Sequence, residues 1–177
     1  MASLKESADC LIRRIEAVLE YDPNEGVFIY RKAMGRQAAG TLAGTKNNNG
    51  YLVISVDGQK ILAHRIAWAW MHGKYPDGAI DHINGVRTDN RIANLRIATP
   101  SQNVANCATR SKTGARGVSY YPDRQNLPWK AFISVGRKTK NLGSFASKQE
   151  ASAAYNRAAR ELFGEFARLN PENSIGL

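Results

Sequence analysis

Four polar residues in one short stretch have the types and spacing of a hydrolytic site. Asp81 and His82 are adjacent, Asn94 follows 12 residues after His82, and Asn103 follows 9 residues after Asn94. A neutral imidazole can take a proton from water near pH 6.5, so His82 is the candidate general base. The Asp81 carboxylate and the Asn103 amide oxygen are ligands that Mg²⁺ or Mn²⁺ prefers, and such an ion stabilises charge on a phosphate. Asn94 has a donor and an acceptor with which to hold the loop and orient His82.

Two short strands and a helix are expected to position these residues. One apolar segment carries Asp81 and His82, and a second spans residues 92–97. Thr99 and Pro100 then offer a hydroxyl cap and a proline suited to the first turn of a helix. Because side chains alternate along a strand, the acid and the imidazole would lie on opposite sides of its pleat. Taken singly, an Asp-His pair is common by chance, and asparagines near glycine usually belong to turns or helix caps.

Composition indicates a polyanionic partner. The chain has 177 residues, 43% of them hydrophobic, which is enough for one ordinary domain or two small ones. The net charge is +10, and it is uneven: residues 1–106 carry 13 Lys and Arg against 10 Asp and Glu, while residues 107–170 carry 12 against 4. The second part is therefore expected to bind most phosphates, although a basic surface can also serve solubility alone.

Secretion, a zinc quartet and a membrane span are not expected. The two cysteines, Cys10 and Cys107, cannot form a four-cysteine zinc site. No apolar run approaches the roughly 20 residues that cross a membrane, and the N-terminus lacks the apolar core of a signal peptide. We expect a cytoplasmic protein without a small-molecule substrate. We also expect a monomer, but the sequence leaves the oligomeric state open, because it contains no heptad or obvious exposed dimer stripe.

The remaining pattern predicts further helices and strands on both sides of a boundary near Lys112. Before it we expect a helix with apolar residues at 11–19, a strand at 27–30, a hairpin turn at Asp57-Gly58 flanked by 51–56 and 59–63, and a helix at 64–72. After it we expect strands at 118–121, 129–135 and 139–142, followed by a helix with a capping box of Ser147 and Glu150 that ends at Gly164.

The stretch DHINGVRTDNRIANLRIATPSQN closely resembles the HNH endonucleases, particularly the phage and intron-encoded homing type in which asparagine replaces the last histidine of the name. The resemblance implies a ββα-metal fold at about residues 79–107, with Asp81 and Asn103 on one divalent ion. It also implies His82 as general base and Asn94 as the central asparagine. Because the final position is an asparagine, a zinc-type site that depends on histidine is not expected.

The sequence does not decide the roles of four residues in or near this motif. The segment from Tyr21 to the motif is similar to the region that precedes it in phage HNH proteins, so His64 or Arg65 could approach the scissile phosphate. Asn90 and Asn106 lie near the assigned asparagines and are alternatives to them.

A second resemblance covers roughly residues 113–170. RGVSYY, WKAFISV, NLGSFASKQEASAAYNRAARELFG and ARLN resemble the plant ethylene-response-factor (Apetala-type) DNA-binding domain, which also occurs in phage homing endonucleases. The resemblance implies a three-stranded sheet in the DNA major groove with the helix packed behind it. The positions that keep order and spacing are Gly117-Val118, Leu142-Gly143, Phe145, Glu150-Ala151, Ala154-Tyr155 and Leu169-Asn170.

The same resemblance assigns the expected DNA contacts. Arg116 matches a DNA-contacting arginine, and the outward strand positions are Ser119, Tyr121, Phe132 and Ser134. Asn141 stands where the plant domains usually have tryptophan, so a plant-type target sequence is not implied. The basic residues expected to bind phosphates are Arg124, Lys130, Arg137, Lys138 and Lys140. The alternative for this segment is a basic module that binds protein.

We therefore expect an α+β protein: a ββα-metal HNH nuclease module followed by a small three-stranded antiparallel sheet packed on one helix. Residues 1–111 would form the nuclease domain, 112–170 the DNA-binding domain and 171–177 a tail. The expected function is site-specific hydrolysis of double-stranded DNA with one Mg²⁺ or Mn²⁺ per site, in the host cytoplasm if phage-encoded. One active site per chain implies one cut per binding event, so a monomer would nick one strand of the DNA.

Two other functions fit parts of the pattern. A DNA-binding transcriptional regulator could keep the HNH fold as a scaffold without catalysis, although the complete set of candidate residues argues against this. The second function is that of a nuclease specific for RNA or for a nucleic-acid structure, because charge alone does not distinguish DNA from RNA.

Overall fold

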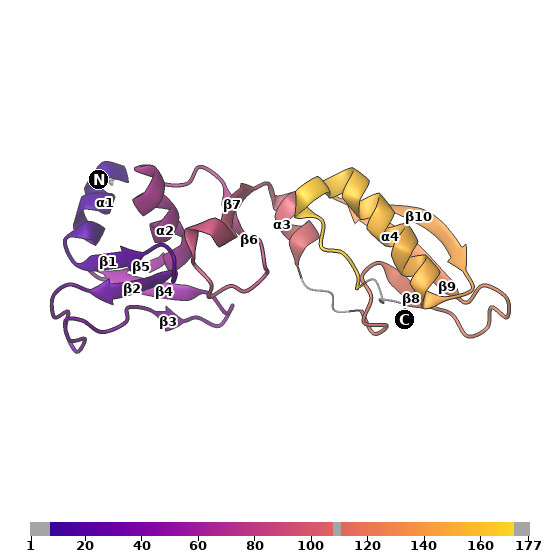
Figure 1. The fold of residues 1–177 in the computed structure, drawn as a ribbon, viewed down its shortest axis with the longest axis horizontal. Coiled ribbons are helices and arrows are strands. Elements are labelled where there is room, and N and C mark those ends of the chain that lie inside the picture. The colour runs from indigo at the N-terminus through magenta and orange to yellow at the C-terminus, as the bar shows by residue number, and fades with distance from the viewer. Residues whose placement is uncertain (1–7, 108–110, 172–177) are drawn as a thin grey trace, which may run out of the picture. The chain divides into compact units, whose positions relative to one another are not determined.

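The fold of the chain is a mixed α+β arrangement of small antiparallel sheets and helices, shown in Figure 1 as a computed structural model that describes residues 8–107 and 111–171. Its contacts divide it into two compact units, residues 1–98 and 99–177. This division lies upstream of the boundary expected near Lys112, and it groups the helix after Thr99 with the second unit. No helix in the described ranges is long and apolar enough to cross a membrane.

The first unit contains two helices, one short 3-10 turn and seven strands among its described residues. The strands form three sheets, with orders β1-β2, β3-β4-β5 and β6-β7. In chain order the elements are α1 (Ala8–Glu16), β1 (Leu19–Asp22), β2 (Val27–Tyr30), β3 (Thr45–Lys46), β4 (Leu52–Val56), β5 (Gln59–Leu62), α2 (Ala63–His72), β6 (Ala79–His82), η1 (Ile92–Asn94) and β7 (Leu95–Ala98).

The opening helix, α1, ends at Glu16, three residues before the end of the apolar pattern. Leu19 belongs to β1, where it pairs with Tyr30 of β2 in an antiparallel hairpin that the sequence did not reveal. Its side chain still enters the core, beside Ile15 of α1 and Phe28 of β2. The helix and the strand that follows it bury apolar side chains in the same core. The apolar pattern in the sequence therefore continues past the end of the helix.

The predicted hairpin and helix at 51–73 are confirmed. Asp57 and Gly58 both have positive φ, 49° and 80°, as a tight two-residue turn requires. Helix α2 follows β5 directly and ends at Gly73, whose left-handed backbone returns its N–H to the Ala69 carbonyl. Ile54 of β4 and Ile66 of α2 are almost completely buried, so this helix covers the sheet of β3, β4 and β5.

The predicted pair of short strands around the candidate site is β6 and β7. Their register places Asp81 opposite Arg96 and His82 opposite Leu95. Ile92, expected in the second strand, lies instead in the 3-10 turn η1 that leads into it. The polar loop 83–91 connects the two strands and is closed by this turn.

In the second unit a sheet packs on one helix, as predicted. Its elements are α3 (Pro100–Asn106), β8 (Val118–Tyr120), β9 (Trp129–Val135), β10 (Lys138–Phe145), α4 (Lys148–Phe163) and η2 (Gly164–Phe166), and the sheet order is β10-β9-β8. Figure 1 shows α4 lying along this sheet. Ala131 and Ile133 of β9 are buried against it, Ile133 in one cluster with Tyr155 and Ala159 of α4.

Side-chain caps fix the starts of both helices in this unit. Thr99 accepts from the Gln102 N–H while the Gln102 side chain accepts from the Thr99 N–H, so α3 begins with a complete capping box. Ser147 caps α4 through the Glu150 N–H. The Glu150 carboxylate accepts from the Ala146 N–H at 3.2 Å, one residue before the position expected for a capping box.

Candidate functional site

Asp81 and His82 are both buried at the end of β6. Each side chain is about 4% exposed. Arg96 on the paired strand β7 places Nε and Nη2 each 2.9 Å from Asp81 Oδ2. A buried carboxylate needs such a partner, because removing a charge from water costs several kcal/mol unless it is paired or hydrogen-bonded.

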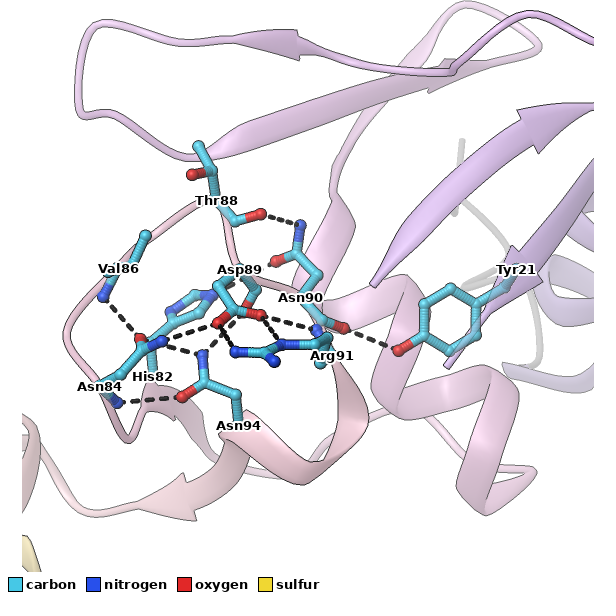
Figure 2. A network of polar contacts seen from close by, with 9 residues as sticks. All are labelled: Tyr21, His82, Asn84, Val86, Thr88, Asp89, Asn90, Arg91 and Asn94. Atoms are coloured by element: carbon cyan, nitrogen blue, oxygen red, sulfur yellow. Dashed lines mark hydrogen bonds and ion pairs between the residues drawn. The ribbon is translucent and has the colours of Figure 1, made fainter. Parts of the chain in front are cut away.

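A network of amides shapes the loop beside His82 (Figure 2). Asn94 Oδ1 accepts from the Asn84 N–H at 3.0 Å, and Asn94 Nδ2 donates to Asn84 Oδ1 at 3.1 Å and to the Asp89 carbonyl at 2.8 Å. The Arg91 guanidinium binds both carboxylate oxygens of Asp89 and holds the pKa of that carboxyl down, to about 2. The predicted role of Asn94 in tying down the loop agrees with these contacts.

The imidazole itself contacts a different asparagine. His82 Nε2 lies 3.3 Å from Asn90 Oδ1, and Asn90 Nδ2 donates to the Thr88 carbonyl at 3.3 Å. The Asn94 side chain bonds Asn84 and Asp89 instead. Asn90, whose role the sequence left open, is 1% exposed and thus belongs to the interior of the site.

The hairpin of β1 and β2 supports this asparagine from behind. Tyr21 Oη donates to the Asn90 carbonyl at 2.7 Å, and the Ile92 N–H donates to the Pro23 carbonyl at 3.2 Å. Gly26 comes so close that a Cβ there would lie 2.3 Å from the Arg91 nitrogen, and its φ is +70°. Only glycine fits such an approach with a left-handed backbone.

His64 of α2 packs against the candidate base. The two imidazole rings meet edge to face, with centroids 5.1 Å apart, and Tyr51 contacts both. His64 Nδ1 is buried and has no hydrogen-bond partner in the described part of the chain. On the outer side of Tyr51, the Arg87 guanidinium lies 4.9 Å from the ring centroid and donates to the Asn49 carbonyl.

Burial keeps both imidazoles neutral. Desolvation lowers the pKa of His82 below its ordinary value, opposed by the Asn90 hydrogen bond and the Asp81 and Asp89 charges, and Arg87 lowers it further. Desolvation and the neighbouring His82 lower the pKa of His64 to about 3. A neutral His82 can accept a proton at neutral pH, which is the state that a general base needs. Arg65, the other open residue of α2, donates to the carbonyls of Pro76 and Gly78.

The donor chemistry fits a hard divalent ion. Asp81 offers a carboxylate and Asn103, half-buried on α3, offers an amide oxygen, and both are ligand types that such an ion prefers. Magnesium commonly binds through one or two protein oxygens and keeps several waters. In the described ranges no three His, Cys, Asp or Glu residues group as metal ligands. Asp81 and Asn103 belong to different compact units, so their joint use stays a prediction.

Arg116 makes contacts within the second unit that its predicted role in DNA binding did not include. Its Nη2 donates to the Val104 carbonyl at 2.6 Å and its Nη1 to the Cys107 carbonyl, both at the C-terminal end of α3. Its backbone N–H and carbonyl are bonded by the Asn170 side chain. Cations interact favourably with the last carbonyls of a helix, so this arginine stabilises α3.

The predicted DNA contacts on the sheet divide between its two faces. The face away from α4 carries Ser119, Lys130, Phe132 and Ser134. The three β9 residues alternate with Ala131 and Ile133, which are buried against α4, and Ser119 pairs with Lys130 and so shares its face. Lys138 and Lys140 alternate along β10 and share one face, and because Lys140 pairs with Ile133 this face is the α4 side. Of the remaining predicted contacts, Tyr121 and Arg124 follow β8, where the guanidinium stacks on the Tyr121 ring, and Arg137 lies in the turn before β10.

Comparison with known proteins gives a family match over the candidate site. A family model described as HNH endonuclease matches residues 62–105. An uncharacterised HNH endonuclease of Acanthamoeba polyphaga mimivirus is 38% identical over 125 residues, which are 69% of this chain and 63% of the relative. Protein 3.8 of Escherichia phage T7 is 35% identical over 109 residues, 60% of this chain and 88% of the relative. No solved structure matches.

The chain spans 63% of the length of the mimivirus relative, so part of that relative lies outside the match. The matched range 62–105 includes Asp81, His82, Asn90, Asn94 and Asn103. The chain belongs to the HNH endonuclease family, a family of DNA hydrolases.

Proposed function

We propose that this protein is a site-specific DNA endonuclease of the ββα-metal type, in which His82 takes a proton from the attacking water. Asp81 and Asn103 would hold one Mg²⁺ or Mn²⁺. When bound, such an ion supplies Lewis-acid stabilisation of the phosphate oxygens. We further propose a phage or homing role, in which one site per chain cuts one strand at each binding event.

The observation that carries this proposal is the environment of His82. It is buried, its pKa is lowered by desolvation, and it sits beside a buried carboxylate on the same strand. Arg87 adds a positive charge near it, stacked on Tyr51 and exposed on the loop 83–91. A neutral base next to an oxygen ligand and a cation is the set of groups that phosphodiester hydrolysis needs.

The basic second unit supports double-stranded DNA as the substrate. Residues 107–170 carry 12 Lys and Arg against 4 Asp and Glu, and the sheet and α4 follow the order expected for an Apetala-type DNA-binding domain. Phosphate contacts from such a unit would position the duplex. The target sequence would be read by side chains on the face away from α4.

The test is cleavage of supercoiled plasmid by purified protein. With Mg²⁺ we expect relaxed circles, and with a chelator none. His82→Ala should lower the rate by about 10²- to 10⁴-fold, as losing a general base does. Its affinity for DNA, measured by fluorescence anisotropy, should stay within a few-fold of that of the wild type.

His72→Ala is the matched control, because His72 is an exposed imidazole stacked on Trp68 at the end of α2. It should cut like the wild type. Tight binding of DNA without cleavage under any metal condition would favour the non-catalytic regulator instead. A rate of His82→Ala close to the wild-type rate would reject His82 as the base.

A further inference from the structure

The orientation of the Asn90 amide follows from its two partners. One end of the amide faces the Thr88 carbonyl and the other faces His82 Nε2, each at 3.3 Å. A carbonyl oxygen only accepts hydrogen bonds, so the NH₂ group must face Thr88. The opposite orientation would bring the Asn90 and Thr88 carbonyl oxygens together and leave both acceptors without a donor in this contact, which costs about 1–3 kcal/mol.

Asn90 Oδ1 is therefore the atom that faces the imidazole. An amide oxygen can only accept, so Nε2 of a neutral His82 must carry the proton in this contact. The lone pair that accepts a proton during catalysis is then on Nδ1. This assignment needs only the amide geometry.

We propose that Asn90 is the positioning residue of the candidate base: it holds His82 in the tautomer with the proton on Nε2 and the lone pair on Nδ1. The proposal rests on the proposed function of His82. It transfers the orienting role from Asn94, whose side chain closes the loop through Asn84 and Asp89.

The hairpin of β1 and β2 fixes Asn90 in place. Figure 2 shows Tyr21 reaching the Asn90 backbone from the side opposite the imidazole. Burial raises the pKa of Tyr21 to about 12, so its hydroxyl stays a donor throughout the working pH range. The Pro23 carbonyl and the close approach of Gly26 hold the next residues, Arg91 and Ile92. The hairpin thus acts on the base through Asn90.

The expected loss of activity in Asn90→Ala can be taken from other proteins in which a hydrogen-bond partner orients a functional imidazole. Removing the partner that orients a functional imidazole typically costs about 10- to 100-fold in activity. Asn90 is 1% exposed, so its loss removes no contact with DNA. We expect Asn90→Ala to reduce the cleavage rate in this range while the affinity for DNA changes less than a few-fold.

The direct test is the tautomer itself, read by ¹⁵N NMR of the imidazole nitrogens in the full chain without metal or DNA. The chain has three histidines, so variants of His64 and His72 assign the His82 signals. We expect a protonated, slowly exchanging Nε2 and an unprotonated Nδ1 in the wild type. Protonation at Nδ1 in the wild type would overturn the proposal without any variant being needed.

Three variants separate positioning from general support. Asn90→Asp keeps an acceptor and should keep the slowly exchanging Nε2–H, whereas Asn90→Ala should lose it to exchange with water. Asn94→Ala is the matched control: it weakens the same loop but leaves the acceptor, so the Nε2–H signal should persist. Loss of the signal in Asn94→Ala, or its persistence in Asn90→Ala, would overturn the proposal.

Tyr21→Phe tests the hairpin if Asn90→Ala fails to fold. It removes the hydrogen bond from Tyr21 to the Asn90 backbone carbonyl and leaves the side chains of Asn90 and His82 unchanged. We expect faster exchange of Nε2–H than in the wild type, and exchange identical to the wild type would remove the hairpin from the proposal. These readouts need no cleavage, so they stand apart from the His82→Ala assay that tests the proposed function.

Discussion

Burial keeps single residues of the candidate site in one protonation state over a wider pH range than water alone would. His64 is the clearest case, because its ring is 5% exposed and its Nδ1 lacks a hydrogen-bond partner among the described residues. Desolvation and the neighbouring His82 keep its pKa near 3, so it stays neutral while it packs against the candidate base. The fold therefore depends on an imidazole that must not become charged.

Acid should destabilise the protein through His64. Its folded pKa is lowered to about 3 from an ordinary value of 6.5, so the unfolded chain binds more protons between these pH values. Stability from this group is complete above pH 6.5 and falls as pH drops towards 3, by about 1.4 kcal/mol per pH unit. Between pH 7 and pH 5 the wild type should lose about 2 kcal/mol more than His64→Leu.

Urea denaturation of both proteins at the two pH values measures this difference. His72→Ala serves as the control, because it removes an exposed imidazole outside the cluster of His64, His82 and Tyr51. Equal losses in the wild type and in His64→Leu would show that His64 takes up protons in the folded protein as readily as in the unfolded chain.

Residue types and spacing predicted the members of the candidate site, but not the partner of each side chain. The adjacency of Asp81 and His82 and the interval to Asn94 are visible in the sequence, and all three lie in the site. The bond from Asn90 to His82 depends on how the loop 83–91 folds back, and on a hairpin about 70 residues away that holds it. Such contacts leave no periodic signal in the chain.

Among the elements, α3 is fixed by contacts that its own sequence does not show. It is a helix of seven residues, too short to be stable alone. A cavity of about 550 Å³ lies beside it, lined by residues that include Val104, Ala105 and Phe132. With little packing on that side, its capping box and the Arg116 guanidinium carry much of its stability.

Arg116→Ala should therefore loosen α3. Hydrogen bonds from a charged group contribute about 1.5–3 kcal/mol, so the backbone amides of residues 103–107 should exchange with solvent about ten- to a hundredfold faster. Arg124→Ala is the control, since Arg124 contacts Tyr121 and Ser144 on another part of the unit. Unchanged exchange in α3, together with a weaker affinity for DNA, would return Arg116 to the role of a DNA contact.

Element types were predictable where the apolar period was long or a turn signal was strong. The hairpin at Asp57-Gly58 and helix α4 are examples. Strand β1 was not predictable, because its buried Leu19 and Tyr21 continue the apolar pattern of α1. Strand β10 runs to Phe145, beyond the predicted end at Leu142, because a bulge at Gly143 restores its pairing with β9.

For the whole molecule, the distribution of charge sets how DNA would be held. Most of the excess positive charge lies in residues 107–170, and the lysines of the sheet divide between its two faces. Lys130 lies with Phe132 and Ser134 away from α4, while Lys138 and Lys140 lie on the α4 side. Only one of these faces can rest in a groove.

The salt dependence of DNA binding identifies that face. Each phosphate contact removed lowers the slope of log K against log salt by about 0.9. We expect this reduction for Lys130→Ala and a smaller one for the double variant Lys138→Ala and Lys140→Ala, by anisotropy titrations over a range of salt. A larger reduction in the double variant would place the DNA against the α4 side, where both lysines then bind phosphates as the sequence predicted.

The hydrogen bonds of the loop 83–91 also affect its chemical degradation by deamidation. Asn84 precedes Gly85, and in a free chain the glycine nitrogen of such a pair attacks the side-chain amide and releases ammonia, so asparagine is a thermolabile residue. Here the Gly85 N–H is bonded to the His82 carbonyl, and the Asn84 side chain is held by Val86, Asp89 and Asn94. Deamidation at this position therefore requires the loop to open first, and the chemical lifetime of the site is set by the free energy of that opening.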